Sequence, residues 1–392
     1  MRMRKATAAL VGLLLAGVAA TPAHAETIRS RQWHLDALKA EELWKTSRGE
    51  GVILAVIDSG VGRVAELEGQ VLPGKDFATS YDGDERTDYG NHGTGMASVI
   101  AGTGKHPSGD GAFGLAPGAK ILPIRTPHEE GREGNTPTWV AAIRYAADSD
   151  AKIINFSMAR RGEDPGLRDA VKYALSKGKL IFAGVGNTGF GENPVLYPAA
   201  TPGVVGVGAI GRDAKATDES QKGPQVDLSA PGVDILSGCS GKSELCNSHG
   251  TSDATALASA SAALLWAAHP DWTGNQVLRV LLNTAGKPVD GVERNDHVGY
   301  GVVRPRVALP SPGDPGPADV YPLPDLAAAE AAKSPPPSPS AGGKTPEAGQ
   351  PQPGPQAGKE TGGGALTWIG LGLGACLLVG GAVAAAVRRA RR

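Results

Sequence analysis

The sequence lacks three features that would assign it to common classes of protein: an excess of charge of one sign, paired cysteines and clustered histidines. Its 39 lysines and arginines nearly balance its 40 aspartates and glutamates, which leaves a net charge of −1 and no basic surface for nucleic acid. Its three cysteines form no C-x-x-C motif, and its eight histidines show no metal-ligand spacing. The acidic run at residues 82–85 is better explained as a solvated loop than as a cation site. We therefore expect no nucleic-acid partner, no bound metal and no other cofactor.

The first 25 residues have the pattern of a secretory signal peptide. A basic start at residues 1–5 precedes an apolar stretch at residues 6–20, and Ala23-His24-Ala25 forms a small-x-small cleavage site. A membrane anchor is the alternative, but the apolar run is short for one. We expect the mature chain to begin near Glu26, outside the cytoplasm. There Cys239 and Cys246 can oxidise to a disulfide that closes a small loop, with a free buried pair as the alternative.

The C-terminal part of the sequence changes character twice. The contents of 56 glycines and 30 prolines are high, and much of the excess lies in residues 310–364, which have too few apolar residues to fold and are predicted to form a disordered linker. Residues 365–387 carry no charge and are long enough to span a bilayer as one helix. The arginine-rich residues 388–392 follow and are predicted to lie in the cytoplasm.

Between these segments, strand patterns alternate with helical patterns. The predicted strands are residues 52–57, 119–124, 153–158, 180–183 and 204–210, and the predicted helices include residues 138–147, 166–177 and 254–268. The alternation predicts one large α/β domain at residues 51–309, with a mostly parallel sheet covered on both faces. Residues 26–50, with a short amphipathic helix at residues 38–44, form an N-terminal extension that is too short to fold alone.

Three residues that can form a catalytic set lie where such sites occur. Asp58 ends the first predicted strand, at the edge where open α/β sheets bind ligands. His92 begins a run of small residues that predicts a helix, and the helix dipole there favours a neutral imidazole that can act as a base. Ser252 lies at the first turn of the helix that continues through residues 254–268. Taken singly, Asp58 is explained as a turn cap and Ser252 as a helix N-cap.

Taken together, these residues supply the chemistry of nucleophilic catalysis. A serine hydroxyl is a weak nucleophile, so a neutral imidazole must take its proton, and a buried carboxylate must orient that imidazole and stabilise its charged form. Asn187 lies in the loop after the strand at residues 180–183, where its side-chain amide can donate to a developing oxyanion.

Four short motifs then resemble, in order and context, the signatures of the subtilisin-like serine proteases. The motifs are Asp58-Ser59-Gly60, His92-Gly93-Thr94, Gly186-Asn187 and Gly250-Thr251-Ser252. The resemblance covers residues 50–309 and implies a subtilisin-like three-layer α/β/α fold. It implies that Asp58 orients His92, that His92 is the base and that Ser252 forms an acyl-enzyme. It also implies an oxyanion hole built from Asn187 and the backbone N–H of Ser252.

The same resemblance implies where an extended peptide substrate binds. The residues concerned are Ser157, Met158, Ala159, Val185 and Gly186. The first three would pair with the substrate backbone, and the last two would face them across the first specificity pocket. The bond between Tyr197 and Pro198 resembles a family segment that carries a cis proline.

The layout of the whole chain resembles a narrower group, the membrane-anchored mycosins of type VII secretion. The shared features are an N-terminal extension containing Trp33, a proline-rich stalk and one C-terminal helix with an arginine-rich end. Three positions depart from the usual family pattern, because Asp253 replaces an apolar residue, Ala256 a proline and Met158 a leucine. No departure removes a catalytic group, but a carboxylate at residue 253, beside the oxyanion, predicts reduced activity.

We therefore expect a serine endopeptidase that acts on proteins or peptides. It would be anchored in the cell membrane by one C-terminal helix, with its catalytic domain outside and subunits of a membrane secretion complex as partners. The alternative is a structural subtilase-like component with little or no proteolytic activity. An esterase would use the same three residues, but the chain lacks the Gly-x-Ser-x-Gly elbow of that fold.

Overall fold

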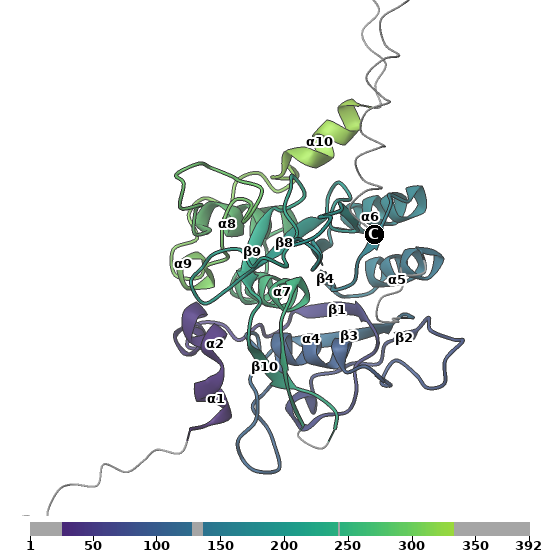
Figure 1. Cartoon of the computed structure of the whole chain (residues 1–392), viewed down its shortest axis with the longest axis vertical. Coiled ribbons are helices and arrows are strands. Elements are labelled where there is room, and N and C mark those ends of the chain that lie inside the picture. The colour runs from purple at the N-terminus through teal and green to yellow at the C-terminus, as the bar shows by residue number, and fades with distance from the viewer. Residues whose placement is uncertain (1–25, 128–135, 242–243, 333–392) are drawn as a thin grey trace, which may run out of the picture. The chain divides into compact units, whose positions relative to one another are not determined.

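A seven-stranded sheet forms the centre of the protein in a computed structural model, which describes residues 26–127, 136–241 and 244–332. Every pairing within the sheet is parallel (Figure 1). In spatial order the strands are β2 (Lys75–Asp76), β3 (Lys120–Arg125), β1 (Ile53–Asp58), β4 (Ile153–Phe156), β6 (Leu180–Gly184), β8 (Val205–Ile210) and β9 (Leu228–Pro231). The predicted parallel α/β class is confirmed, and the predicted strands differ from these by one or two residues at their ends.

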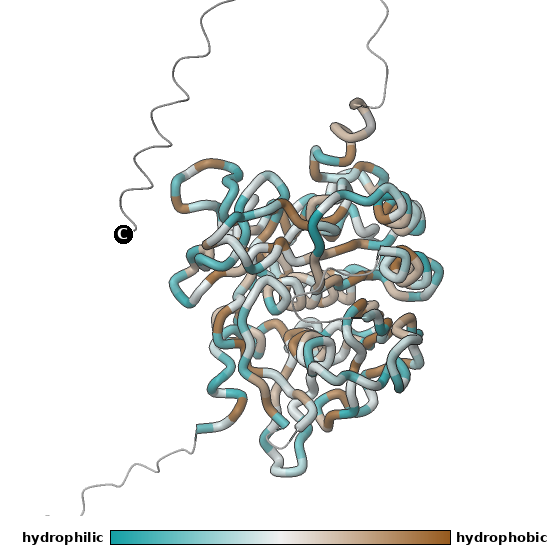
Figure 2. Tube along the Cα trace, turned by 45° about the vertical axis from the view of Figure 1, so that its right-hand side comes forward, coloured by the Kyte–Doolittle hydropathy of each residue, from teal (hydrophilic) through white to brown (hydrophobic). Residues whose placement is uncertain are grey.

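The residues of β1 show how the sheet is covered on both faces. Leu54 and Val56 belong to one buried apolar cluster, whereas Ala55 and Ile57 belong to a second. Side chains alternate across a strand, so the two clusters lie on opposite faces of the sheet. Figure 2 shows hydrophobic segments running through the middle of the folded part, with hydrophilic segments along many of its outer loops.

Helices complete the two outer layers. The first cluster includes residues of α4 (His92–Ala101), α7 (Thr251–Ala268) and α8 (Gly274–Thr284), and the second includes residues of α5 (Thr136–Asp148) and α6 (Pro165–Ser176). The three-layer α/β/α arrangement is therefore confirmed. Asp164 caps α6 by accepting a hydrogen bond from Leu167 N, and Thr273 begins α8 with a capping box.

Helix α7 occupies the middle of its layer and is buried along nearly its whole length (Figure 1). It packs against α4 and against strands β4, β6, β8 and β9. Its sequence is rich in alanine and serine, and such short side chains allow a helix to lie close to its neighbours. Within this contact, Ser259 Oγ donates a 3.1 Å hydrogen bond to Asn155 Oδ1 of β4.

The N-terminal extension is part of the same hydrophobic core. It forms α1 (Ile28–Arg31), α2 (Trp33–Leu38) and α3 (Ala40–Leu43). The short helix predicted at residues 38–44 corresponds to α3, which begins two residues later because Lys39 has a left-handed backbone with φ of 61° and separates α3 from α2. Leu35 is fully buried, and Gln32 Nε2 donates a 3.0 Å hydrogen bond to Leu236 O.

Two hairpin-like pairs lie outside the main sheet. Strands β10 (Ile235–Gly238) and β11 (Leu245–Ser248) are antiparallel, and a disulfide joins Cys239 to Cys246 just beyond β10. Strands β5 (Arg160–Arg161) and β7 (Leu196–Tyr197) are also antiparallel. The peptide bond after β7, between Tyr197 and Pro198, is cis, as the family resemblance implies.

Residues 310–332 are folded, which corrects the linker predicted from residue 310. After α9 (Pro305–Ala308), this strap runs back over α8 and ends in α10 (Pro324–Ala331). Arg279 of α8 donates hydrogen bonds to three strap carbonyls, those of Pro315, Pro317 and Val320. Leu323 is only 2% exposed. The amino-acid composition does not predict this contact. A proline-rich segment lacks many N–H donors but keeps its carbonyl acceptors, which one arginine distant in the sequence can bind.

The remaining predicted segments lie outside the described residues. They are the signal peptide at residues 1–25, the rest of the linker to residue 364, the membrane helix at residues 365–387 and the tail at residues 388–392. Among the helices that the structure does describe, none combines the length and apolar character needed to cross a bilayer.

Replacing Arg279 with alanine should release the strap. Three carbonyls lose their donor, which we expect to lower the free energy of unfolding by about 1–3 kcal/mol. Limited proteolysis should then cut within residues 311–323 faster than in the wild type, and chemical denaturation would give the stability change. Arg279→Lys should behave similarly, since one ammonium cannot reach all three acceptors. Unchanged cleavage rates in both variants would contradict this role.

Candidate active site

Asp58 is the last residue of β1, and its carboxylate is fully buried. Its Oδ1 accepts a 2.7 Å hydrogen bond from Ser59 N and lies 2.7 Å from His92 Nδ1. The approach of α4 to this carboxylate requires a glycine after the histidine. A Cβ at Gly93 would lie 2.2 Å from Gly60 O and 2.9 Å from Asp58 Cβ. The sequence His-Gly is therefore a packing requirement of the Asp–His pair.

His92 is the first residue of α4, and its side chain is 28% exposed. Burial alone would lower the pKa of His92, but Asp58 opposes this effect through its charge and hydrogen bond. With further contributions from Asp253 and Asp88, the carboxylates raise the pKa of His92 to about 9. These carboxylates thus act against the neutral imidazole that the helix dipole favours.

Ser252 is the second residue of α7, which begins after the glycine N-cap at Gly250. Its hydroxyl donates a 3.1 Å hydrogen bond to Ser157 O, and Ser157 Oγ donates in return to Ser252 O at 3.3 Å. These bonds connect the start of α7 to the segment that follows β4. Because α7 also packs against α4, which begins at His92, the serine and histidine lie near the N-termini of two adjacent helices.

Asn187 lies in the loop after β6 and is held by the start of α7. Its Oδ1 accepts a 2.8 Å hydrogen bond from Thr251 N, while Thr251 Oγ1 accepts one of 3.2 Å from Gly186 N. The other end of the amide faces the residue before the helix, since a Cβ at Gly250 would lie 2.7 Å from Asn187 Nδ2. With its oxygen occupied, the amide presents its N–H donors, which are the groups that an oxyanion needs.

The predicted substrate-binding residues differ in how far their side chains are exposed. Met158 is 5% exposed, and its sulfur accepts a 3.7 Å hydrogen bond from Thr126 Oγ1. Val185 is fully buried in the cluster that also contains residues of α5 and α6, so its side chain packs in the core. The role of residues 185–186 beside the first specificity pocket stays a prediction. Of the segment after β4, Ala159 retains partial exposure.

Sequence reasoning missed Asp88. Its Oδ1 accepts a 2.9 Å hydrogen bond from Ser59 Oγ, and its Oδ2 accepts one of 2.8 Å from Thr94 N in the first turn of α4. Asp88 therefore caps the helix that carries His92 and contacts the residue after Asp58. An acidic residue four positions before a histidine at a predicted helix start was the available signal.

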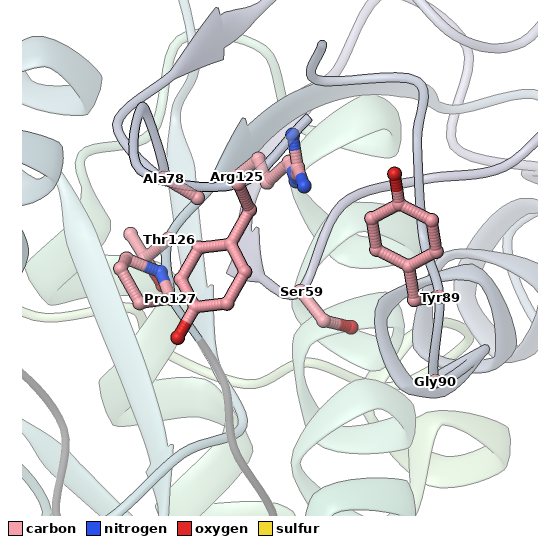
Figure 3. Close-up of a pocket in the computed structure, with 8 residues that line it drawn as sticks. Ser59, Ala78, Tyr89, Gly90, Arg125, Thr126 and Pro127 are labelled. Atoms are coloured by element: carbon pink, nitrogen blue, oxygen red, sulfur yellow. The ribbon is translucent and has the colours of Figure 1, made fainter. Parts of the chain in front are cut away.

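A small cavity beside the Asp–His pair was also missed (Figure 3). Its volume is about 60 Å³, and its walls include Ser59, Tyr81, Tyr89, Arg125 and Thr126. Two wall residues contact Asp58 directly, because Ser59 N donates to the carboxylate and Thr126 N donates a 2.8 Å bond to the main-chain oxygen. Figure 3 shows Ser59 between Tyr89 and the segment of Thr126 and Pro127.

A parallel sheet covered on both faces, with an Asp–His pair at its edge and a serine at the first turn of the adjoining helix, is the arrangement of subtilisin-like serine endopeptidases. The chain is an enzyme of that class. The model of the subtilase family matches residues 49–301, and the chain belongs to that family.

Comparison with three similar proteins shows which members of the family the chain resembles. Mycosin-1 of Mycolicibacterium smegmatis is 30% identical over 332 residues, which cover 71% of this chain and 72% of that protein. An intracellular serine protease of Paenibacillus polymyxa is 33% identical over 237 residues, covering 59% of this chain and 71% of that protein. The crystal structure of MycP1 from the ESX-1 type VII secretion system has a TM-score of 0.63 and 29% identity, covering 74% of this chain and 88% of that one. The chain is thus related to the mycosins.

Gly250→Ala should displace the Asn187 amide and reduce kcat. A methyl group 2.7 Å from Nδ2 forces the side chain to move, and the loss of one oxyanion donor typically lowers kcat by about 10²–10³-fold. Peptide-hydrolysis kinetics would measure the change. Gly241→Ala is the matched control, because Gly241 has a similar φ of 134° but nothing within 4 Å of the new Cβ. Equal effects of the two substitutions would show that backbone strain alone is responsible.

Proposed function

We propose that Asp58, His92 and Ser252 act as the catalytic triad of this endopeptidase. The observation that carries the proposal is the 2.7 Å contact between His92 Nδ1 and the fully buried Asp58 carboxylate. This contact keeps the proton on Nδ1 and leaves Nε2 to act on the serine. The location of Ser252 at the first turn of α7, which packs against α4, supports its role as the nucleophile.

The reaction proceeds through two stages. His92 Nε2 takes the proton of Ser252 Oγ as that oxygen attacks the peptide carbonyl, and it then gives the proton to the leaving amine. In the second stage, His92 Nε2 takes a proton from water as the water oxygen attacks the acyl-enzyme, and it then returns a proton to Ser252 Oγ as that oxygen leaves. In each tetrahedral intermediate, Asn187 Nδ2 and the backbone N–H of Ser252 donate to the oxyanion, while Asp58 stabilises the imidazolium.

The substrate is an extended segment of a protein or peptide. Residues 157–159 leave the sheet at the end of β4, so their backbone groups can pair with a substrate strand next to Ser252. The cavity bounded by Ser59 and Tyr89 lies beside the Asp–His pair and can receive a neighbouring substrate side chain.

A membrane-tethered role in secretion is the second part of the proposal. The sequence supports an exported chain with a signal at residues 1–25 and an anchor at residues 365–387, which would place the catalytic domain outside and the arginine-rich end in the cytoplasm. The similar MycP1 is described as a protein of the ESX-1 type VII secretion system. Subunits of such a membrane complex are the partners that this relationship favours.

One observation favours a second candidate, a structural subtilase-like component with little proteolysis. Burial lowers the pKa of His92, but the Asp58, Asp253 and Asp88 carboxylates raise it overall above its ordinary value, which favours the protonated base, and a protonated base cannot accept the proton of Ser252. Activity at alkaline pH distinguishes an attenuated enzyme from an inactive component.

Ser252→Ala should abolish hydrolysis of a peptide library and labelling by a fluorophosphonate probe. Loss of the nucleophile typically costs about 10⁶-fold in kcat. His92→Ala should fall to the same level, since the triad acts as a unit. Hydrolysis that survives in Ser252→Ala would refute the triad. A folded wild type that neither cleaves nor labels at pH 9 would establish the structural role.

Deleting residues 333–392 should convert a membrane-bound protein into a soluble one. The deletion removes the predicted linker, membrane helix and tail but retains the strap and α10. Fractionation with alkaline extraction would measure the change, and intact cells treated with external protease should lose the full-length catalytic domain. Continued membrane retention of the truncated chain would show that the anchor lies elsewhere.

A further inference from the structure

The hairpin of β10 and β11 packs against the helix that begins at His92. Cys239 follows β10 and is joined by the disulfide to Cys246 of β11, which closes the turn of the hairpin. Gly238 N, at the end of β10, donates a 2.8 Å hydrogen bond to Ser98 Oγ of α4. Cys239 is 2% exposed, so this end of the disulfide lies in the core. The mechanism described above gives the hairpin no role.

Asn91, the residue before His92, binds this hairpin through its side chain. Its Nδ2 donates a 3.0 Å hydrogen bond to Ser240 O, and its Oδ1 accepts one of 3.0 Å from Ser240 N. The amide thus pairs with both backbone groups of the residue after Cys239, 149 positions away in the sequence. An asparagine at a helix start usually caps the helix, but the side chain of Asn91 makes no capping bond, and Asp88 supplies it instead.

The backbone of Asn91 is in the left-handed region, with φ of 61° and ψ of 6°. Few residues other than glycine adopt this conformation, and asparagine is one of those that do so most readily. The main-chain oxygen of Asn91 accepts a 2.9 Å hydrogen bond from Gly95 N in α4. Asn91 therefore joins the start of α4 to the hairpin, with its backbone on the helix and its side chain on Ser240.

This connection matters because His92 must stay aligned with a fixed partner. Its Nδ1 lies 2.7 Å from Oδ1 of Asp58, which is fully buried at the end of β1. A side chain of limited reach keeps this contact only while the backbone from which it starts stays in place. A shift of the first residue of α4 by a fraction of an ångström would lengthen the contact and turn the imidazole away from the serine.

The other strand of the hairpin reaches the helix of the proposed nucleophile. Strand β11 ends at Ser248, whose hydroxyl donates a 2.7 Å hydrogen bond to Asp253 Oδ1 in the first turn of α7. One end of the hairpin thus bonds the residue before His92, and the other bonds the residue after Ser252. The hairpin connects the starts of the two helices that carry these residues.

We propose that Asn91 is a positioning residue that anchors His92, through Ser240, to the hairpin closed by Cys239 and Cys246. The inference rests on the proposed role of His92 as the general base. The disulfide contributes by holding the backbone of Ser240, since a chain that is not closed covalently samples more conformations. Because this role concerns the placement of the imidazole and not the binding of substrate, loss of the Asn91 amide should affect kcat rather than KM.

Asn91→Gly is the central test, because glycine accepts a φ of 61° without strain and the substitution removes only the side chain. We expect kcat to fall by about 10–100-fold, as it does when a catalytic group is slightly misplaced, while KM stays within about twofold of the wild type. Peptide-hydrolysis kinetics would measure both constants. An unchanged kcat in folded Asn91→Gly protein would overturn the proposal.

Asn193→Gly is the matched control. Asn193 also has a left-handed backbone, with φ of 48°, and its amide pairs with both backbone groups of Lys222 at 3.0 Å and 2.8 Å. Both asparagines are half-buried. The two substitutions should therefore lower the melting temperature by similar amounts, whereas Asn91→Gly should reduce kcat far more. Equal losses of kcat would show that general destabilisation is responsible, and the positioning role would be wrong.

Replacing both Cys239 and Cys246 with alanine tests the contribution of the disulfide. If the disulfide acts through Ser240 and Asn91, its removal should lower kcat in the wild type and have a smaller effect in Asn91→Gly protein, where the contact is already lost. Circular dichroism would establish that each variant is folded. Equal factors in the two backgrounds would reject the connection between the disulfide and Asn91.

An NMR measurement separates this inference from the proposed function. In Ser252→Ala protein, which needs no activity, the Nδ1 proton between His92 and Asp58 reports the placement of the imidazole. Asn91→Gly should make this proton exchange faster with water, and Asn193→Gly should not. Equal exchange rates in the Asn91→Gly and parent proteins would overturn the positioning role. Faster exchange, in a protein whose wild type cleaves no peptide, would support the positioning role and reject the catalytic assignment.

Discussion

The close contact between α7 and the sheet is the constraint on which the rest of the structure depends. Residues 254–266 are all buried, and they are mostly alanine and serine, so the helix axis lies near strands β4, β6, β8 and β9. This contact brings the first turn of α7 to the ends of those strands. Ser252 then meets the carbonyl of Ser157, and Thr251 meets the amide of Asn187. Larger side chains along α7 would separate all of these groups together.

Electrostatics at the site reflects a balance between orientation and reactivity. Asp58 must lie against His92 to orient it, and Asp88 must cap α4 to hold it. Each of these carboxylates also favours the charged imidazole, and Asp253 adds to the same effect. In a low-dielectric interior such contributions are large, so a site with several structural carboxylates makes its own base harder to deprotonate.

Local patterns predicted the sheet and the contact between Asp58 and His92 because those features follow from local chemistry. The β-branched run that ends at Asp58 forms β1 within one residue of its predicted bounds. The failures arise from contacts distant in sequence. Arg279 orders a strap whose composition predicts disorder. The raised pKa of His92 depends on three carboxylates from different parts of the chain, which no single motif encodes.

Contacts between segments that are far apart in the sequence determine when the catalytic domain can finish folding. Gln32 bonds to Leu236 across 204 residues, Ser47 to Leu264 across 217 and Arg306 to Ala37 across 269. Contacts of such long sequence separation form late, because the entropy of closing each loop must be overcome first. A chain that emerges from a ribosome or a translocation channel cannot complete this core until residue 306 is free. Ser252, at the first turn of α7, therefore belongs to a core that is complete only when the last helices of the domain are present.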